Sequence, residues 1–366
     1  MRDYRWLRAA ILLTVVLSIA CSDASDPGPA AEYELLFVNT EKGVPGEDIF
    51  RMNADGTGRE NLTRLSIVQY PTFALAVTYR SMALAPDGRT IAFESSRDGC
   101  PGIWGMSVDG SGIRKLSIGE YQSTRCNYYP LWAPDGARIA FTTSREGRWS
   151  VYVMDADGTN ARNVSSPLDQ ESGFNWPAGW SPDGRIVFHH PTGSTGRFQA
   201  YTVKPDGTEL RPLFGRTGDH SPDWSPDGSE VVFIRDSQTG SSLFIMKADG
   251  TNIRQLTTEP GEIVFSSENF QNDYNRWSPD GRRVAYIRRI ESRNELHVIN
   301  ADGSGDVRLT SYSADFNGWA PDGRVTFSSD VNGLHDIYLI NADGSGLLNL
   351  TNTSTSDEIR ALWVRR

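Results

Sequence analysis

Five histidines are the residues in this chain with the widest chemical repertoire, and they are His189, His190, His220, His297 and His335. No two of them have zinc-motif spacing such as His-Glu-x-x-His. The sequence also has no Gly-x-Ser-x-Gly nucleophile elbow and no Cys-x-x-Cys pair. It therefore predicts no catalytic centre, no metal ligands and no cofactor, although a site assembled from distant loops stays open.

One acidic stretch, residues 155–160, resembles the start of a calcium-binding loop, with carboxylates at Asp155 and Asp157. An EF-hand loop requires a bidentate Glu at its twelfth position, which here is Ser166. The same Asp-Gly turn returns in every repeat of the chain, in most copies after Ala, so we interpret it as a structural hairpin turn.

A five-residue motif recurs along the chain and divides it into repeats. Trp-(Ser/Ala)-Pro-Asp-Gly begins at Trp132, Trp180, Trp224, Trp277 and Trp319, and a sixth copy opens with Leu84. Pro presets φ near −65° in such a turn, and Gly takes the positive-φ position that closes a short hairpin. Each copy is followed by a β-type run such as Ile139-Ala140-Phe141.

A second motif alternates with the first and reads Val-Tyr-Val-Met-Asp-Ala-Asp-Gly-Thr at residues 151–159. It is followed by a short run that commonly ends in Leu-Thr, so each repeat predicts four strands, A to D. Successive A-strand anchors are 42 to 53 residues apart, which is the period of propeller blades. An open solenoid is the alternative, but it requires capping repeats that the sequence does not show.

The two ends of the repeat region favour a closed ring. Strands B, C and D are predicted before Leu84, and residues 360–364 supply a single A strand at the end. Together they complete one blade. We therefore predict an all-β, seven-bladed β-propeller of four-stranded antiparallel blades, closed by N-terminal strands and a C-terminal innermost strand.

These two motifs resemble the repeat of TolB-like propellers, across residues 33–366. The resemblance implies the fold and little about function. We expect neither the N-terminal α/β domain of TolB nor the hydrolase domain that follows similar repeats in prolyl-oligopeptidase-like peptidases.

The N-terminal residues 1–20 have the pattern of a secretory signal peptide, with Arg2, Arg5 and Arg8 before an apolar run. Residues 18–21, Ser-Ile-Ala-Cys, resemble a lipoprotein lipobox. We expect Cys21 to carry the lipid, residues 21–32 to form a flexible tether, and the propeller to occupy residues 33–366 in the cell envelope, on the periplasmic side of the outer membrane or at the cell surface. An ordinary signal peptide is the alternative.

The net charge indicates which partners the chain is expected to bind, and the cysteine content predicts a disulfide. The net charge is −10, and removal of residues 1–20, with three Arg and one Asp, makes it −12. An acidic surface disfavours nucleic acid and anionic lipid, so we expect membrane contact through the lipid only, and a monomer. Cys100 and Cys126 remain as an even pair in an exported chain, which predicts one disulfide.

Propeller geometry places the Pro-Asp-Gly and Ala-Asp-Gly turns on one face and longer connections on the other, loop-rich face. The longer connections are predicted at residues 65–79, 118–129, 166–176, 189–199 and 258–274. Residues at the starts of the A strands should point toward the channel on the loop-rich face. The candidate ligand-binding or partner-binding residues there are Tyr128, Asn175, His220, Asp273, Tyr274, Asp315 and Glu358.

Two functions stay open from the sequence. The first is a noncatalytic envelope lipoprotein that binds a protein, peptide or glycan on the loop-rich face, with residues 258–274 at the rim. The second is a propeller enzyme, a polysaccharide lyase or hydrolase, that uses the same channel mouth. Propellers serve both purposes, so the fold alone does not choose.

Overall fold

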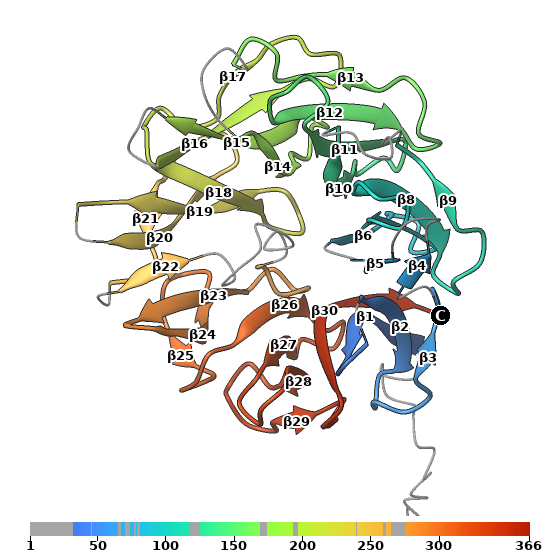
Figure 1. Ribbon diagram of the computed structural model, residues 1–366. Helices are drawn as coiled ribbons and strands as arrows, with labels where there is room; N and C mark the ends of the chain where they lie inside the picture. Colours follow the sequence, from blue (N-terminus) through green and yellow to red (C-terminus); the bar gives the residue numbers. More distant parts are fainter. Residues whose placement is uncertain are drawn as a thin grey trace, which may run out of the picture.

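Seven four-stranded antiparallel sheets are arranged around a central axis in the computed structural model (Figure 1). The structure describes residues 32–366 except for residues 45, 65–66, 70–73, 77, 79–80, 118–124, 169–173, 193–196, 239, 259–260 and 265–275. The predicted signal peptide, Cys21 and nearly all of the tether lie outside the described residues, as do Asp273 and Tyr274. The predicted fold class is confirmed.

The blades follow one another along the chain, and the strands of each blade run in order from the innermost to the outermost. The first three blades are β30 (Ser356–Arg365), β1 (Tyr33–Glu41), β2 (Asp48–Asn53) and β3 (Glu60–Asn61); β6 (Met82–Leu84), β7 (Thr90–Ser95), β8 (Gly102–Ser107) and β9 (Arg114–Lys115); and β10 (Asn127–Trp132), β11 (Arg138–Thr143), β12 (Ser150–Asp155) and β13 (Arg162–Asn163).

The next two blades are β14 (Trp176–Trp180), β15 (Ile186–Thr192), β16 (Arg197–Val203) and β17 (Arg211–Pro212); and β18 (Asp219–Trp224), β19 (Glu230–Asp236), β20 (Ser241–Lys247) and β21 (Arg254–Gln255). The last two are β22 (Glu262–Val264), β23 (Arg283–Ile290), β24 (Arg293–Asn300) and β25 (Val307–Arg308); and β26 (Asp315–Trp319), β27 (Val325–Ser329), β28 (Asp336–Ile340) and β29 (Leu348–Asn349).

The first and last strands of the propeller close the ring, as the sequence predicts. β30 pairs antiparallel with β1, from Tyr33 opposite Arg365 to Glu41 opposite Ser356. A register shift between Leu36 and Val38 interrupts the ladder, and Arg360 in the facing strand has φ 58°. The chain ends therefore contribute to the same blade.

The B strands are buried on both faces because each sheet lies between two neighbouring sheets. In β11, Ile139 and Phe141 pack in a cluster with Ile103 of the preceding blade, whereas Ala140 packs with Phe188 of the following blade. Side chains alternate between the two faces of a strand, so consecutive apolar residues serve two different interfaces.

The repeated turns have the geometry expected from their residues. In the turn after β10, the Asp135 carboxylate accepts a 2.9 Å hydrogen bond from the Ala137 amide. Gly158, after β12, has φ 93°, and a Cβ at this position would lie 2.1 Å from the Leu116 carbonyl oxygen. Gly is therefore required at residue 158 by backbone conformation and by contact with the preceding blade.

The repeated tryptophans connect neighbouring blades through their indole N–H groups. Trp132 donates to the Ala83 carbonyl at 3.2 Å, and Trp180 donates to the Leu131 carbonyl at 3.2 Å. Each acceptor is the residue immediately before the preceding anchor position. The motif thus holds adjacent inner strands together as well as forming a turn.

The predicted disulfide is present. Cys100 lies between β7 and β8, Cys126 lies just before β10, and their Cα atoms are 5.4 Å apart. The bond joins two connections on the loop-rich face.

Three predicted loops contain strands. The sequence predicts one long connection over residues 258–274, but β22 lies within them and forms the inner strand of its blade. Ile263 is buried in the interface there, whereas Trp277 makes only an isolated bridge with Val284. This bridge has the register that Trp132 and Trp180 have with Ile139 and Ile186, so Trp277 meets its B strand as the motif predicts, and β22 lies further upstream in the chain.

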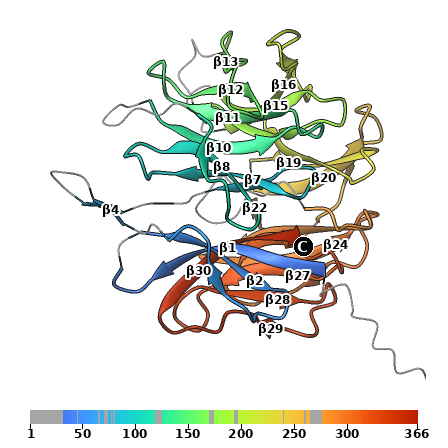
Figure 2. The same ribbon diagram turned by 90° about the vertical axis from the view of Figure 1, so that its right-hand side faces the viewer.

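Two further segments that the sequence predicts as loops also contain strands. Residues 65–79 include a two-stranded sheet of β4 (Ile67–Gln69) and β5 (Ala74–Ala76), and β4 projects beyond the ring in Figure 2. Residues 189–199 are predicted as a loop, but β15 and β16 continue to the pair Thr192 and Arg197. His189 and His190 are therefore buried strand residues.

Candidate binding surface on the loop-rich face

Aromatic rings from two adjacent blades meet on the loop-rich face, and we call this set the aromatic band. Trp149, between β11 and β12, lies 5.0 Å from Tyr128 and 4.4 Å from Phe174, measured between ring centroids. Phe174 also lies 6.3 Å from Tyr129 and 5.3 Å from Trp176. The band consists of Tyr128, Tyr129, Trp149, Phe174, Trp176 and Phe198.

The band has a buried base and a partly exposed surface. Trp176 is 2% exposed and contacts Phe198 at 4.8 Å and His189 at 5.0 Å. The remaining rings of the band are half-buried. The surface rings are thus supported from below, which limits the side-chain entropy that a bound partner would have to remove.

Bulges in the inner strands shape this region. The ladder between β10 and β11 shifts register between Tyr128 and Leu131, and Tyr129 has φ 59°. The ladder between β18 and β19 shifts between His220 and Asp223, and Ser221 has φ 58°. An extra residue in one strand redirects its side chains, and bulges of this type are frequent beside functional sites.

Histidines extend the contacts from the band to the next blade. His189 lies 6.3 Å from His220 between ring centroids, and its Nε2 accepts a 3.0 Å hydrogen bond from the Ser221 amide. Burial lowers the pKa of His189 well below its usual value, and electrostatic interactions with His220 and Arg276 lower it further. The ring is therefore held in its neutral form.

A Ser–His–Asp hydrogen-bond series also occurs here. His220 Nδ1 lies 2.6 Å from Ser221 Oγ, and its Nε2 lies 3.2 Å from Asp236 Oδ1. Such a series resembles a catalytic triad in order, but a nucleophile must reach its substrate. Ser221 is 0% exposed, so we interpret the series as a structural support for the bulge.

Asn175 lies beside the band and supports it from within. Its Oδ1 is 2.8 Å from His190 Nδ1, and its backbone carbonyl accepts a 3.1 Å hydrogen bond from Thr142 Oγ1. Its amide donates to the Trp149 carbonyl at 3.1 Å. Because Asn175 is buried, it fixes Trp149 and β14 relative to each other.

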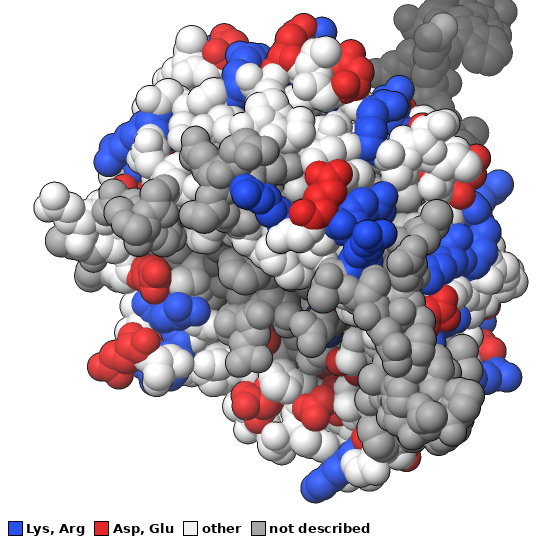
Figure 3. Space-filling view, turned by 45° about the horizontal axis from the view of Figure 1, so that its top comes forward, with Lys and Arg blue, Asp and Glu red and all other residues white. Residues whose placement is uncertain are grey.

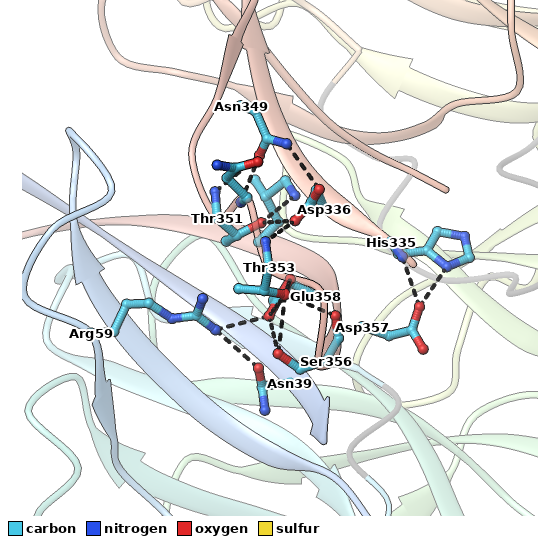
Figure 4. A network of polar contacts seen from close by, with 12 residues as sticks. Asn39, Arg59, His335, Asp336, Asn349, Thr351, Thr353, Ser356, Asp357 and Glu358 are labelled. Atoms are coloured by element: carbon cyan, nitrogen blue, oxygen red, sulfur yellow. Dashed lines mark hydrogen bonds and ion pairs between the residues drawn. The ribbon is translucent and has the colours of Figure 1, made fainter. Parts of the chain in front are cut away.

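The other two described candidates lie in different blades. Asp315 is the first residue of β26 and is half-buried. Glu358 in β30 is fully buried, and its carboxylate accepts hydrogen bonds from Arg59, Thr353 and Ser356 at 2.9, 3.0 and 2.5 Å (Figure 4). Glu358 thus connects the C-terminal strand to the N-terminal part of its blade and does not face solvent.

The structure therefore brings Tyr128, Asn175 and His220 into one region and leaves Asp315 and Glu358 elsewhere. Sequence reasoning missed Tyr129, Trp149, Phe174 and Phe198. The signal that could have found them is the presence of large rings in the connections of consecutive repeats at their loop-rich ends.

The described residues on the face of the molecule seen in Figure 3 form no patch of a single charge sign. In the view of Figure 3, acidic and basic side chains are interspersed. Among the residues that the structure describes, no group of three or more His, Cys, Asp or Glu is arranged to hold a metal ion. The described part of the chain also has no helix long and apolar enough to cross a membrane.

Comparison with known proteins agrees with this fold. Residues 122–268 match the family model of the TolB beta propeller domain. A probable dipeptidyl-aminopeptidase B of Talaromyces marneffei is 37% identical over 78 residues, which cover 19% of this chain and 8% of that protein. The chain thus matches only a small part of this relative.

Two solved structures share the fold at low identity. TolB from Acinetobacter baumannii superposes with a TM-score of 0.54 and 17% identity, covering 92% of this chain and 68% of that one. An oligogalacturonate lyase from Vibrio parahaemolyticus superposes with a TM-score of 0.58 and 13% identity, covering 88% and 86%. The chain is thus a seven-bladed β-propeller whose central repeats, residues 122–268, match the family model of the TolB beta propeller domain.

Proposed function

We propose that this protein is a noncatalytic binding module of the cell envelope, which recognises a protein, peptide or glycan on its loop-rich face. The observation that supports this proposal is the aromatic band. Half-buried rings on a rigid support give a large contact area, and such rings are enriched where proteins recognise partners.

The chemistry of the band suits stacking combined with hydrogen bonds. Tyr128 and Tyr129 carry hydroxyl groups, whereas Trp149, Phe174 and Phe198 offer ring surfaces. Tyr and Trp dominate binding hot spots because they combine a large apolar area with a polar group. Peptide side chains and the apolar faces of sugar rings both match such a surface.

The proposed location follows from the N-terminal sequence. A signal peptide over residues 1–20 and a lipid on Cys21 would export the propeller and anchor it to a membrane. Mass spectrometry of the membrane-extracted protein should detect a diacylglyceryl group on Cys21. A mature protein that begins at another residue would contradict the lipid anchor without affecting the binding surface.

Site-specific crosslinking tests the binding face. A photoreactive amino acid at Tyr128 should capture a partner in envelope preparations, and the same group at Asp135, on the turn face, is the matched control. Tyr128→Ala together with Phe198→Ala should then lower the affinity for the captured partner at least tenfold. If only the probe at Asp135 captures a partner, and the Tyr128 and Phe198 variant keeps its affinity, recognition occurs on the turn face and the proposal is wrong.

The second function predicted from the sequence, a polysaccharide lyase or hydrolase, gains no support from the side chains described. The likeness to an oligogalacturonate lyase is one of fold. Ser221, the nucleophile position of the Ser221–His220–Asp236 series, is buried, so we keep the binding module as the conclusion.

A further inference from the structure

A second concave site lies at the opposite ends of the inner strands, where β10, β14 and β18 meet the Pro-Asp-Gly turns. This cleft has a volume of about 270 Å³. Its lining includes three repeated tryptophans with the residue before each of them, which are Trp132, Trp180, Trp224, Leu131, Gly179 and Asp223. It is distinct from the aromatic band, which occupies the loop-rich ends.

The tryptophans present ring surface to this cleft. All three indoles are half-buried. The N–H groups of Trp132 and Trp180 already donate to backbone carbonyls of the preceding blades, each at 3.2 Å. What these two side chains can offer a ligand is therefore the ring face and edge, and the electron-rich face of indole attracts cations.

Asp223 is the one ionisable side chain among the described residues that line the cleft. It is 7% exposed, and its Oδ2 accepts a 2.7 Å hydrogen bond from the Arg276 amide. This bond fixes the carboxylate beside the rings. The other lining side chains are apolar, so the cleft has a carboxylate acceptor and π surfaces, and no cationic side chain among its lining residues.

Gly179 keeps the cleft open in the middle strand. A Cβ built on this residue would have no heavy atom within 4 Å outside its chain neighbours. Its φ of 152° is also one that favours glycine. The middle of the three strands therefore contributes no side chain to fill the space between the indoles.

We propose that this cleft binds a primary alkylammonium group, either a lysine side chain of a protein partner or a free amine. An ammonium group has donors for the carboxylate and a positive charge for the indole faces, and its alkyl chain matches the apolar walls. The net charge of −10 favours the approach of a cation. An anionic ligand would meet repulsion from both the rings and Asp223.

Titration with n-butylammonium, followed by tryptophan fluorescence, tests this assignment at pH 8. The wild-type protein should show saturable binding, and the neutral analogue n-butanol should bind at least tenfold more weakly. Asp223→Asn keeps an acceptor for the Arg276 amide and should weaken n-butylammonium binding at least tenfold. The control Asp87→Asn, at an exposed turn outside the cleft, should bind like the wild type. Equal binding of the amine and the alcohol, or unchanged binding by Asp223→Asn, would overturn the proposal.

A second pair of variants covers the case in which Asp223→Asn does not fold. Leu131→Lys places a tethered ammonium in the cleft and should abolish n-butylammonium binding, whereas Leu131→Met should retain it. If the folded Leu131→Lys variant still binds n-butylammonium as the wild type does, this cleft is not the binding site.

N-acetyl-lysine N-methylamide identifies the source of the ligand. Binding at least as tight as that of n-butylammonium points to a lysine of a protein partner. Exclusion of this probe, with n-butylammonium retained, points to a free amine. Failure of both probes would refute this site and leave the aromatic band untouched.

Discussion

The indole Nε1 of Trp319 donates a 2.7 Å hydrogen bond to the backbone carbonyl of Arg276 in the preceding blade. Both residues are buried. Trp277 makes the equivalent bond to the Asp223 carbonyl at 3.1 Å. The Arg276 carbonyl also accepts a 2.8 Å hydrogen bond from the Ala285 amide of its own blade, so the indole of the next blade supplies a second donor to it.

Replacement of Trp319 by Phe should lower the free energy of unfolding by about 0.5–1.5 kcal/mol, since the buried Arg276 carbonyl would lose one of its two hydrogen bonds and keep the one from the Ala285 amide. Trp132→Phe is the matched comparison, because its indole is only half-buried and its 3.2 Å bond is longer. Denaturant unfolding followed by circular dichroism should give the larger loss for Trp319→Phe. Equal losses would show that ring volume matters more than the hydrogen bond.

Glu358 is expected to stabilise the closure of the ring. Its buried carboxylate accepts a 2.9 Å bond from Arg59, whose guanidinium also lies 5.2 Å from the centre of the Phe37 ring. Glu358→Ala removes a buried charged acceptor, while the partly exposed Arg59 keeps its hydrogen bond to Asn39, so the variant should lose about 1.5–3 kcal/mol of stability.

The control for this prediction is Arg365→Ala, which removes the exposed contact with Glu32 in the same blade. Surface pairs contribute roughly 0–1 kcal/mol, so this variant should unfold close to the wild type. Thermal unfolding measures both. A Glu358→Ala protein as stable as Arg365→Ala would mean that the buried network does not hold the ring closed.

The repeats made the blades and their closure predictable, because a Pro-Asp-Gly turn has few backbone solutions and each solution returns at the same spacing. β22 was not predictable in the same way. Its Ile263 supplies the buried contact that the motif assigns to residues just before Trp277, and an insertion separates the two.

The candidate site was predicted only in part for a different reason. The starts of the A strands indicated Tyr128, which lies in the aromatic band that we propose as the binding surface. The same rule also selected Glu358, whose burial depends on Arg59, 299 positions away in the chain. Contacts of such long range carry no periodic signal, so the sequence cannot separate a surface acid from a buried one at equivalent strand positions.

His189 should make the protein less stable in mild acid. Its folded-state pKa lies well below the usual 6.5, first because of burial and then because of His220 and Arg276. The unfolded chain therefore binds a proton more readily, and this contribution to stability is present above pH 6.5 and is lost as the pH falls below it.

His189→Gln keeps an acceptor for the Ser221 amide and removes the titrating group. Between pH 6.5 and 5.5 the wild type should lose roughly 1 kcal/mol more stability than the variant, since one pKa unit corresponds to about 1.4 kcal/mol. Unfolding measured over this range checks the slope. Parallel curves for the two proteins would show that His189 is protonated as easily in the fold as in the unfolded chain.

Asp223 should act in the opposite direction. Burial raises its pKa from 3.8 to about 7, although Arg276 partly opposes the shift. The folded protein then holds this proton more tightly than the unfolded chain does. The contribution to stability is complete below about pH 3.8, decreases as the pH rises, and is lost once the pH passes about 7. In Asp223→Asn, which does not titrate, this decrease should disappear.

The measurement is the unfolding free energy of wild type and Asp223→Asn from pH 5 to pH 8. From pH 5 to pH 7 the wild type should lose on the order of 1 kcal/mol per pH unit relative to the variant, and above pH 7 the two curves should run parallel. The exposed Asp87→Asn serves as the control and should follow the wild type. A constant difference between Asp223→Asn and wild type over the whole range would mean that Asp223 is already ionised at pH 5, and the carboxylate would then be better hydrated than its 7% exposure indicates.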